Sequence, residues 1–247
     1  MFPIVHHYIN TELFGTPSKL MRLGAFLPDL SFGFGLNRDE AHLMGRDFLA
    51  WSREECPEAH DVALAVLSHG LRPHGIDYYA DEFWPGQSKG WCFYKGAAWM
   101  DRVEAATHLP AQLIYWKSHN FVEMACELIT VADHPGINDA VVEALEDQQA
   151  VAQLADIIEQ YQEIPAFRPI RSYNRALEIF ALREVTAAEL ARTQADSFAR
   201  RHNCTDADIP AMTELLLEMQ AALTDDYHAF LAEVLPKLRA TIDKAIL

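Results

Sequence analysis

The sequence predicts an all-α protein, and three observations support that fold class. Apolar residues recur at helical spacing through most of the 247 residues, and 50% of all residues are hydrophobic. No stretch shows the alternating pattern of a strand, because the nearest, residues 32–35, is too rich in glycine. Helix-start signals recur along the chain, such as Thr186 followed three residues later by Glu189. We therefore expect a single multi-helix domain with a sizeable core.

The first half of the chain is expected to contain several helices and one long loop. The side chains of Ser18 and Asn37 suit N-caps, and Pro57 and Pro110 suit first turns. The predicted helices are residues 8–14, 19–27, 38–53, 57–70, 91–106 and 111–132. Residues 74–90 are aromatic, acidic and marked by glycine and proline, which indicates a functional loop with one helical turn.

The second half is expected to be scaffold. Helices are predicted over residues 138–162, 172–182, 186–203 and 211–246. These segments are rich in alanine, leucine, glutamate and glutamine, and most of the histidines precede His119. We therefore assign the chemistry to residues 1–135 and expect residues 136–247 to pack against them as part of one continuous domain.

Charge and composition limit the classes of function. The formal net charge of -16 would repel a phosphate backbone, which argues against a polymeric nucleic acid as partner. A small phosphorylated substrate remains compatible, because bound metal can invert the local field. No apolar run approaches ~18 residues, so no transmembrane segment is expected. The absence of a secretory signal and of any CxxC pair favours reduced cysteines and a cytoplasmic location.

One pair of residues suggests metal chemistry. His119 and Glu123 are four residues apart on a predicted helix, so both side chains lie on one face. The two side chains can bind a divalent metal together or simply form a hydrogen-bonded pair. A metal site needs further ligands, and each candidate alone has an ordinary structural alternative, such as a packed core histidine. The candidate ligands are His6, His7, Asp29, His60, His69, His74, Asp77, His119 and Glu123.

Four of these motifs together resemble the zinc-dependent phospholipase C family, whose fold the P1-type nucleases share. The motifs are residues 6–8 (His-His-Tyr), 23–29 (Leu-Gly-Ala-Phe-Leu-Pro-Asp), 67–70 (Leu-Ser-His-Gly) and 119–123 (His-Asn-Phe-Val-Glu). The resemblance covers about residues 1–130, with extra C-terminal helices beyond it. It implies an all-α metal hydrolase with up to three zinc ions. The ligands it implies are His7 or His6, Asp29, His69, His119 and Glu123.

The sequence departs from the family pattern after His69. The family places an aspartate about four residues after this histidine, where this chain has Arg72 or Pro73. Because Pro73 forbids a continuous helix, Asp77 could replace that carboxylate only if the loop folds back. We therefore expect one to three divalent ions, with one or two favoured over three. Zinc is the first choice, and manganese, iron or nickel are alternatives. The N-terminal amine is not expected to be a ligand.

Such a site predicts phosphoester hydrolysis. Metals polarise phosphoryl oxygens, generate hydroxide near neutral pH and stabilise the leaving oxygen. By analogy with the family, Asp29 is a ligand or orients the attacking water, and Asp77 is a second candidate base. A set of aromatic residues could wall the substrate pocket or simply cover helix ends. The members of this set are Tyr78, Tyr79, Phe83, Trp84 and Trp91.

Two other functions stay open at this stage. One is an HD-type phosphohydrolase, which would use the doublet His60-Asp61 together with His42 and a later residue such as Asp133. The other is a non-catalytic helical binding protein that retains a relic metal site. Its acidic helical half could pair with a partner or with a second copy of the chain. The sequence names neither the substrate nor the oligomeric state.

Overall fold

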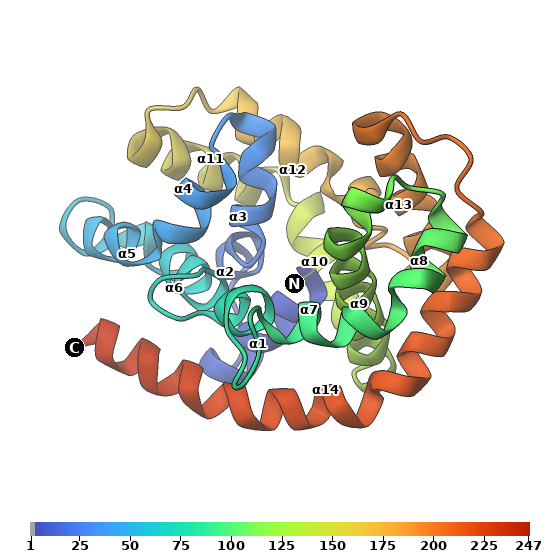
Figure 1. Ribbon diagram of the computed structural model, residues 1–247. Helices are drawn as coiled ribbons and strands as arrows, with labels where there is room; N and C mark the ends of the chain where they lie inside the picture. Colours follow the sequence, from blue (N-terminus) through green and yellow to red (C-terminus); the bar gives the residue numbers. More distant parts are fainter. Residues whose placement is uncertain (1–2) are drawn as a thin grey trace.

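The computed structural model of the chain describes residues 3–247, apart from the side chain of Phe34, and every regular element in it is helical (Figure 1). The all-α prediction is therefore confirmed for these residues. Met1, whose amine the sequence argued against as a ligand, lies outside them. The α-helices are α1 (Pro3–Phe14), α2 (Lys19–Gly24), α3 (Leu27–Leu30), α4 (Arg38–Leu43), α5 (Gly45–Glu54), α6 (His60–His69), α7 (Trp91–Gly96), α8 (Met100–Thr107), α9 (Ala111–Asp133), α10 (Ile137–Glu146), α11 (Gln148–Gln162), α12 (Phe167–Ile179), α13 (Ala187–His202) and α14 (Ile209–Ile246). Short 3-10 or π turns are η1 (Ser31–Phe34), η2 (Pro57–Ala59), η3 (Tyr78–Glu82) and η4 (Ala97–Trp99).

Several predicted helices are split where a cap or a bend intervenes. The predicted helix 138–162 consists of α10 and α11, because the Asp147 side chain accepts hydrogen bonds from the backbone N–H groups of Gln149 and Ala150. This N-cap starts α11 afresh. Residues 38–53 likewise form α4 and α5, with Met44 between them. The first helix starts at Pro3, five residues earlier than the pattern predicted.

Helix α9 lies at the centre of the fold. All residues from Phe121 to Thr130 are buried, so this part of the helix has no solvent face. Helices α1, α7, α8 and α14 pack around it. The long α14 follows the lower edge of the molecule in Figure 1 and contacts α9 and α13. Glu123 and His119 are both buried on this central helix.

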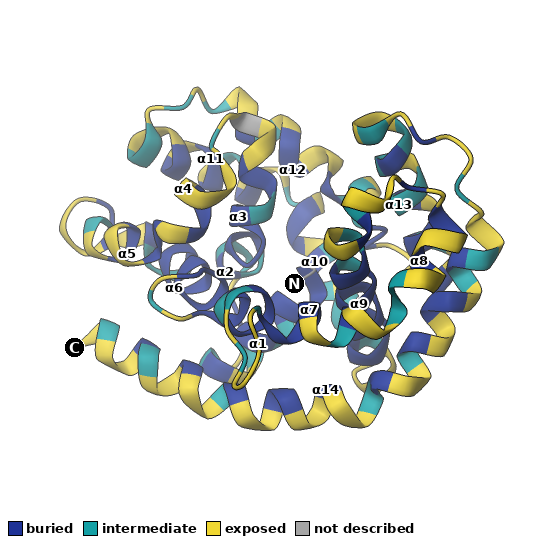
Figure 2. Ribbon diagram, in the orientation of Figure 1, coloured by how far each residue is buried: buried dark blue, intermediate teal, exposed yellow. Residues whose placement is uncertain are grey.

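One hydrophobic core joins the two halves of the chain. Its buried apolar residues extend from Ile4 to Ile242, and the inward faces of the helices are buried throughout (Figure 2). Helix α2 packs against α10 and α11, and the Tyr173 hydroxyl donates a hydrogen bond to the carbonyl oxygen of Leu23, 2.9 Å away. The four cysteines are buried and free. Within residues 3–247, none of the helices combines the length and the apolar character that a bilayer crossing requires.

A close helix contact positions the residues around Asp29. A Cβ atom on Gly24 would lie 3.0 Å from the Cα of Val62, so α2 and α6 approach closely only because this residue is glycine. The short helix α3 follows α2 directly and carries Asp29 in its first turn. The last turn of α6 carries His69. Packing of α2 on α6 thus brings Asp29 of α3 and His69 of α6 into one region.

Candidate metal centre

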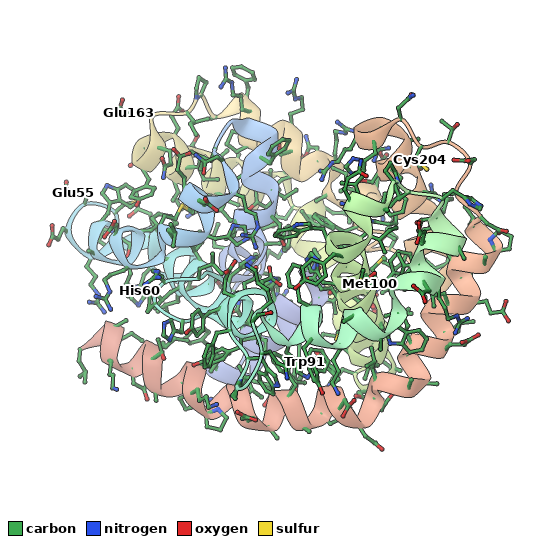
Figure 3. All side chains as sticks on the ribbon, viewed as in Figure 1. Glu55, His60, Trp91, Met100, Glu163 and Cys204 are labelled. Atoms are coloured by element: carbon green, nitrogen blue, oxygen red, sulfur yellow. The ribbon has the colours of Figure 1, made fainter. Side chains whose placement is uncertain are left out.

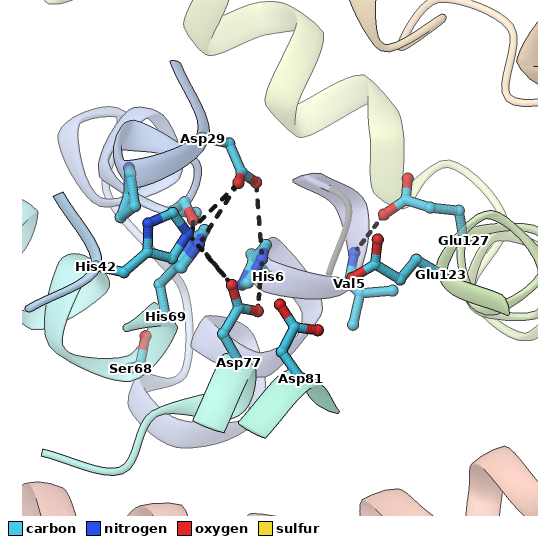
Figure 4. A network of polar contacts seen from close by, with 12 residues as sticks. Val5, His6, Asp29, His42, Ser68, His69, Asp77, Asp81, Glu123 and Glu127 are labelled. Carbon is cyan, nitrogen blue, oxygen red and sulfur yellow. Dashed lines mark hydrogen bonds and ion pairs between the residues drawn. The ribbon is translucent and has the colours of Figure 1, made fainter. Parts of the chain in front are cut away.

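Five side chains from distant parts of the sequence converge in one buried cluster (Figure 4). We call them the imidazole–carboxylate cluster: His6, Asp29, His42, His69 and Asp77. They come from α1, α3, α4, α6 and the segment just before η3. Their ligand atoms fall into two groups in which all atoms lie within 4.8 Å of one another. His69 belongs to both groups.

Asp77 lies between the histidines. Its Oδ1 is 3.6 Å from the Nε2 of His6, and its Oδ2 is 3.4 Å from the Nε2 of His42 and 3.3 Å from that of His69. These separations exceed those of ordinary hydrogen bonds. A carboxylate that directs one oxygen to each side is placed to bridge two cations. Asp29 faces the same imidazoles from the other side, at 3.7 Å to 4.0 Å.

Backbone carbonyl groups orient two of the imidazoles. The Nδ1 of His42 lies 2.8 Å from the Arg38 carbonyl oxygen, and that of His69 lies 2.7 Å from the Ala25 carbonyl oxygen. Because a carbonyl only accepts, each Nδ1 carries the proton and each Nε2 offers its lone pair to the cluster when the ring is neutral. The buried Nε2 of His69 has no partner in hydrogen-bonding geometry among the described residues. Metal-binding histidines are commonly oriented in this way.

The cluster shifts the pKa values of its members. Burial alone would raise the pKa of Asp29 and Asp77, but the neighbouring His69 and His42 lower the pKa of both carboxyl groups. Burial would lower the pKa of His42, but Asp29 and Asp77 outweigh it and raise the value to about 9. The metal-free cluster therefore holds two carboxylates and a proton on His42 at neutral pH. Metal binding must displace that proton.

A second group of possible ligands lies beside the cluster. We call Asp81, His119 and Glu123 the outer triad, whose ligand atoms also lie within 4.8 Å of one another. The Nε2 of His119 is 3.9 Å from the Oε2 of Glu123, too far for a direct hydrogen bond. The Oδ2 of Asp81 accepts a hydrogen bond from Arg38 at 2.8 Å, whereas its buried Oδ1 has no hydrogen-bond partner among the described residues. Burial lowers the pKa of His119 to about 4, which favours the neutral ring that metals require.

The loop after α6 folds back and delivers Asp77. The N–H of Leu71 donates to the carbonyl of His42 at 2.7 Å, and the N–H of Gly75 donates to that of Gly70 at 3.0 Å. A Cβ on Gly70 would lie 2.5 Å from the His42 carbonyl oxygen, so only glycine allows this approach. The condition that the sequence set for Asp77 is therefore met in the structure. The following turn η3 places Asp81 four residues further on.

Three candidate ligands lie elsewhere. None of His7, His60 and His74 belongs to a ligand group among the described residues. His7 is buried one position beyond His6, and burial together with Arg22 lowers its pKa to about 4. His60, labelled in Figure 3, starts α6 at the end opposite His69. The ring of His74 stacks on Tyr78 at 3.6 Å between centroids.

The doublet proposed for an HD-type site does not assemble. Asp61 accepts a hydrogen bond from Ser18, the residue that caps α2. Asp133 pairs with His228 at 2.7 Å. His42, the histidine assigned to that doublet, belongs instead to the imidazole–carboxylate cluster. These contacts give the four HD residues separate structural surroundings.

Sequence reasoning did not include His42 or Asp81 among the candidate ligands of the metal site. His42 was considered only for the HD reading, although it is a buried histidine on the inner face of α4. Asp81 follows Asp77 by four residues, the same spacing that drew attention to His119 and Glu123. That second spaced pair was a usable signal. It was obscured because residues 74–90 were expected to form a loop, in which spacing has no fixed geometry.

A cavity of about 570 Å³ opens onto both groups of ligands. Its lining includes Asp29, His42 and Asp77 from the cluster and all three residues of the outer triad. Helices α12 and α13 supply the opposite wall. The aromatic residues proposed to wall the pocket do not line it: Trp91 stacks on Phe230 at 4.7 Å, and Trp84 contacts the same ring at 5.3 Å. These two rings cover α14 instead.

Comparisons with known proteins give no family for this chain. No protein-family model matches the sequence, and searches of the curated proteins and of the solved structures found no match. The features of this chain that bear on its function are therefore the geometry of the cluster, the outer triad and the cavity.

Proposed function

We propose that this protein is a metal-dependent phosphoester hydrolase with a multinuclear divalent metal centre. The observation that carries the proposal is the position of Asp77, with Oδ1 toward His6 and Oδ2 toward His42 and His69. Adjacent cations that share one carboxylate are the arrangement that phosphoryl-transfer chemistry uses to hold the attacking and leaving oxygens.

The donor set fits divalent metal. Three imidazoles and two carboxylates face one another in the cluster, and two buried polar atoms, His69 Nε2 and Asp81 Oδ1, have no hydrogen-bond partner among the described residues. Buried polar groups without partners are costly, and a cation would offset that cost. Mixed nitrogen and oxygen donors suit zinc, with manganese, iron or nickel as alternatives. We assign two ions to the cluster and one to the outer triad.

The order of the ligands along the chain supports the likeness to the zinc-dependent phospholipase C and P1 nuclease fold. His6, Asp29, His69, His119 and Glu123 follow one another as in that pattern. Asp77 takes the place of the bridging carboxylate eight residues after His69 instead of about four. We include this helical core in the proposal.

The side chains suggest a division of work. Bound divalent metal would supply Lewis-acid charge and nucleophilic hydroxide near neutral pH. Asp77 is buried and would hold metal together with the histidines that its two oxygens face. The Asp29 side chain remains 25% exposed on the cavity side, so it can orient water by accepting a hydrogen bond at a carboxylate oxygen. The low pKa of Asp29 keeps this oxygen unprotonated at neutral pH.

Elemental analysis of the purified protein tests the proposal directly. We expect at least two divalent ions per chain, and hydrolysis of bis-p-nitrophenyl phosphate or p-nitrophenyl phosphate that a chelator abolishes and added zinc restores. Asp77→Asn should remove metal and activity together. His60→Ala should leave both unchanged, whereas the HD-type reading requires the reverse.

A result without bound metal would favour the other reading. If neither zinc, manganese nor iron binds, and no phosphoester is hydrolysed with added metal, the hydrolase proposal fails. The protein would then be a helical binding protein with a relic of a metal site. The buried, mutually facing ligand groups favour the hydrolase, because isolated charged groups are rarely kept in a buried position without a partner.

A further inference from the structure

Basic side chains gather on the side of the cavity that faces the metal ligands. We call Lys117, Arg171, Arg175, Arg200 and Arg201 the basic wall; all five line the cavity. They make up five of only 20 basic residues in a chain with 36 acidic ones. Arg171 and Arg175 come from α12, Arg200 and Arg201 from the last turn of α13. Such a concentration is unexpected in a chain of net charge -16.

Protein carboxylates do not neutralise the basic wall. None of its five residues has an ion-pair partner within residues 3–247. Nearby arginines outside the wall do, since Arg192 pairs with Glu189 and Arg183 with Glu146. Two of the cationic groups lie over rings instead: Arg201 over Phe32 at 5.8 Å and Lys117 over Phe198 at 5.9 Å.

Like charges are close together in the wall. Arg200 and Arg201 are neighbours in the last turn of α13, and Arg171 and Arg175 are one turn apart on α12. Lys117 is two residues from His119, so the wall extends to the outer triad. Mutual repulsion between cationic side chains weakens a structure unless an anion offsets it. The guanidinium groups of the arginines can bind such an anion, because a guanidinium binds phosphate or carboxylate oxygens in pairs.

We propose that the substrate is a small molecule with two anionic groups, in which the basic wall binds a second phosphate or carboxylate while the phosphoester to be cleaved lies at the metal centre. This inference rests on the proposed hydrolase function. The cavity volume of about 570 Å³ is that of a small-molecule site. Phe32 and Trp116 also line it and are 73% and 47% exposed, so the part of the ligand between its charged ends can be apolar.

A neighbouring cavity provides a matched control. It measures about 430 Å³, is lined by paired charges such as Arg192 and Glu189, and contains none of the metal-ligand candidates. Arg171 and Arg201 line only the larger cavity, whereas Arg192 lines only the smaller one. All three side chains are exposed. The double variant Arg171→Gln/Arg201→Gln and the single variant Arg192→Gln therefore differ in which cavity they change.

Anion binding to the chelator-treated full chain tests the wall independently of catalysis. Isothermal titration calorimetry with inorganic pyrophosphate measures whether the wall binds phosphate, and titration with malonate measures whether it binds carboxylate. We expect at least one of them to bind, and the double variant to lose about tenfold or more in affinity for it, as expected for removal of charge-assisted hydrogen bonds. Arg192→Gln should bind like the wild type, and circular dichroism should show all variants folded.

Kinetics then connects the wall to the substrate. With metal present, phosphate release from fructose 1,6-bisphosphate is compared with that from fructose 6-phosphate, and release from 2-phosphoglycolate with that from ethyl phosphate. The wild type should prefer the doubly anionic member of at least one pair, and the double variant should lose that preference through a higher KM.

The outcomes separate the two proposals. If neither probe binds, or if the double variant binds both as tightly as the wild type, the basic wall is not a ligand site and the inference is overturned, even if the protein hydrolyses phosphoesters. If hydrolysis occurs without any preference for a second anionic group, the substrate class is also wrong. If binding depends on the arginines but no metal binds and nothing is hydrolysed, the hydrolase proposal fails and the anion site stands.

Discussion

The two sides of the cavity come mainly from opposite halves of the chain, and carboxylates mark one side whereas arginines mark the other. The ligand side, which comprises the imidazole–carboxylate cluster and the outer triad, uses residues between His6 and Glu123. The basic wall is supplied mainly by α12 and α13. The second half of the chain is thus more than scaffold. It shapes the space in which any ligand of the first half must fit.

The difference also concerns how the charges are held. On the ligand side Asp77, Asp81 and Glu123 are buried and Asp29 is partly buried, so packing fixes the positions of these carboxylates. The four arginines of the wall are exposed and have no carboxylate partners among the described residues. A side that holds cations needs rigid ligands, whereas a side that recognises an anion can use mobile, long side chains. Substitutions on the two sides should therefore have different kinetic effects.

The largest effect is expected from Asp29→Asn. The amide keeps the size of the side chain but loses the negative charge and one of the two acceptor oxygens that orient water, so kcat should fall by about 10²–10³-fold. At least one ion should remain, because Asp77 still faces three histidines. Steady-state kinetics and elemental analysis measure both quantities. Asp39→Asn, exposed in the first turn of α4, is the control. If only KM changed, Asp29 would act in substrate binding, as proposed for the basic wall. The expected kinetic difference between the two sides of the cavity would then not hold.

Glu123→Gln should act more locally. The substitution retains an oxygen that can accept the hydrogen bond from Asn120, now 3.0 Å long, but removes one of the two carboxyl groups of the outer triad. We expect the loss of one ion per chain, with affinity reduced about tenfold or more, while the cluster keeps its metal. Metal titration of this variant and of the exposed Glu54→Gln distinguishes the cases. Loss of all ions would show that the cluster and the triad form one cooperative unit.

The sequence predicted the ligand side better than the wall. His6, Asp29, His69, His119 and Glu123 all fall in groups that could hold a metal ion, and they stand out in the sequence because such side chains are chemically distinctive and sit in short motifs. The role of Asp77 could only be stated conditionally, since spacing rules assume a helix and this segment is a turn closed by hydrogen bonds to the backbone. His42 and Asp81 were passed over for similar reasons: each joins the others through tertiary packing alone.

No sequence motif indicated the basic wall. Arg171 and Arg175 have the ordinary spacing of a solvated helix face. Arg200 and Arg201 lie in the last turn of α13, where basic residues are favoured by the helix dipole. The position of each arginine pair is therefore explained by its own helix, without any reference to a ligand. Only the packing of α12 and α13 across from the metal ligands makes the four arginines one surface.

Buried ionisable groups should make the ligand side sensitive to pH. Glu127 accepts the Val5 N–H at 2.9 Å and thereby supports the helix that carries His6. Burial, with a smaller effect of Glu123, raises the pKa of Glu127 from 4.5 to about 8. The folded protein keeps this proton between pH 4.5 and 8, whereas the unfolded chain releases it. Stability should therefore fall as pH rises through that window, by up to about 1.4 kcal/mol per pH unit.

Glu127→Gln isolates this contribution. The amide cannot ionise, so the wild type should lose stability relative to the variant as pH rises between about pH 5 and 8. Urea unfolding in the presence of a chelator measures the difference without the pH dependence of metal binding. The exposed Glu54→Gln should parallel the wild type. Parallel curves for wild type and Glu127→Gln would show that Glu127 is ionised in the folded state.

The smallest effect is expected from Gly96→Ala, where helix α7 meets α9 beside His119. Alanine favours a helix over glycine by about 1 kcal/mol, but the new Cβ would lie 2.9 Å from the backbone carbon of Ser118. The backbone of a buried helix can move aside only at a high cost in free energy. The steric clash should therefore outweigh the gain in helix propensity and destabilise the fold by about 1–3 kcal/mol. Metal affinity of the outer triad should fall with it, whereas pyrophosphate binding at Arg171 and Arg201 should persist. Urea unfolding measures the change in the free energy of unfolding, with the exposed Ala98→Ser as control. A gain in stability would mean that α7 and α9 are not held as closely as the ligand geometry requires.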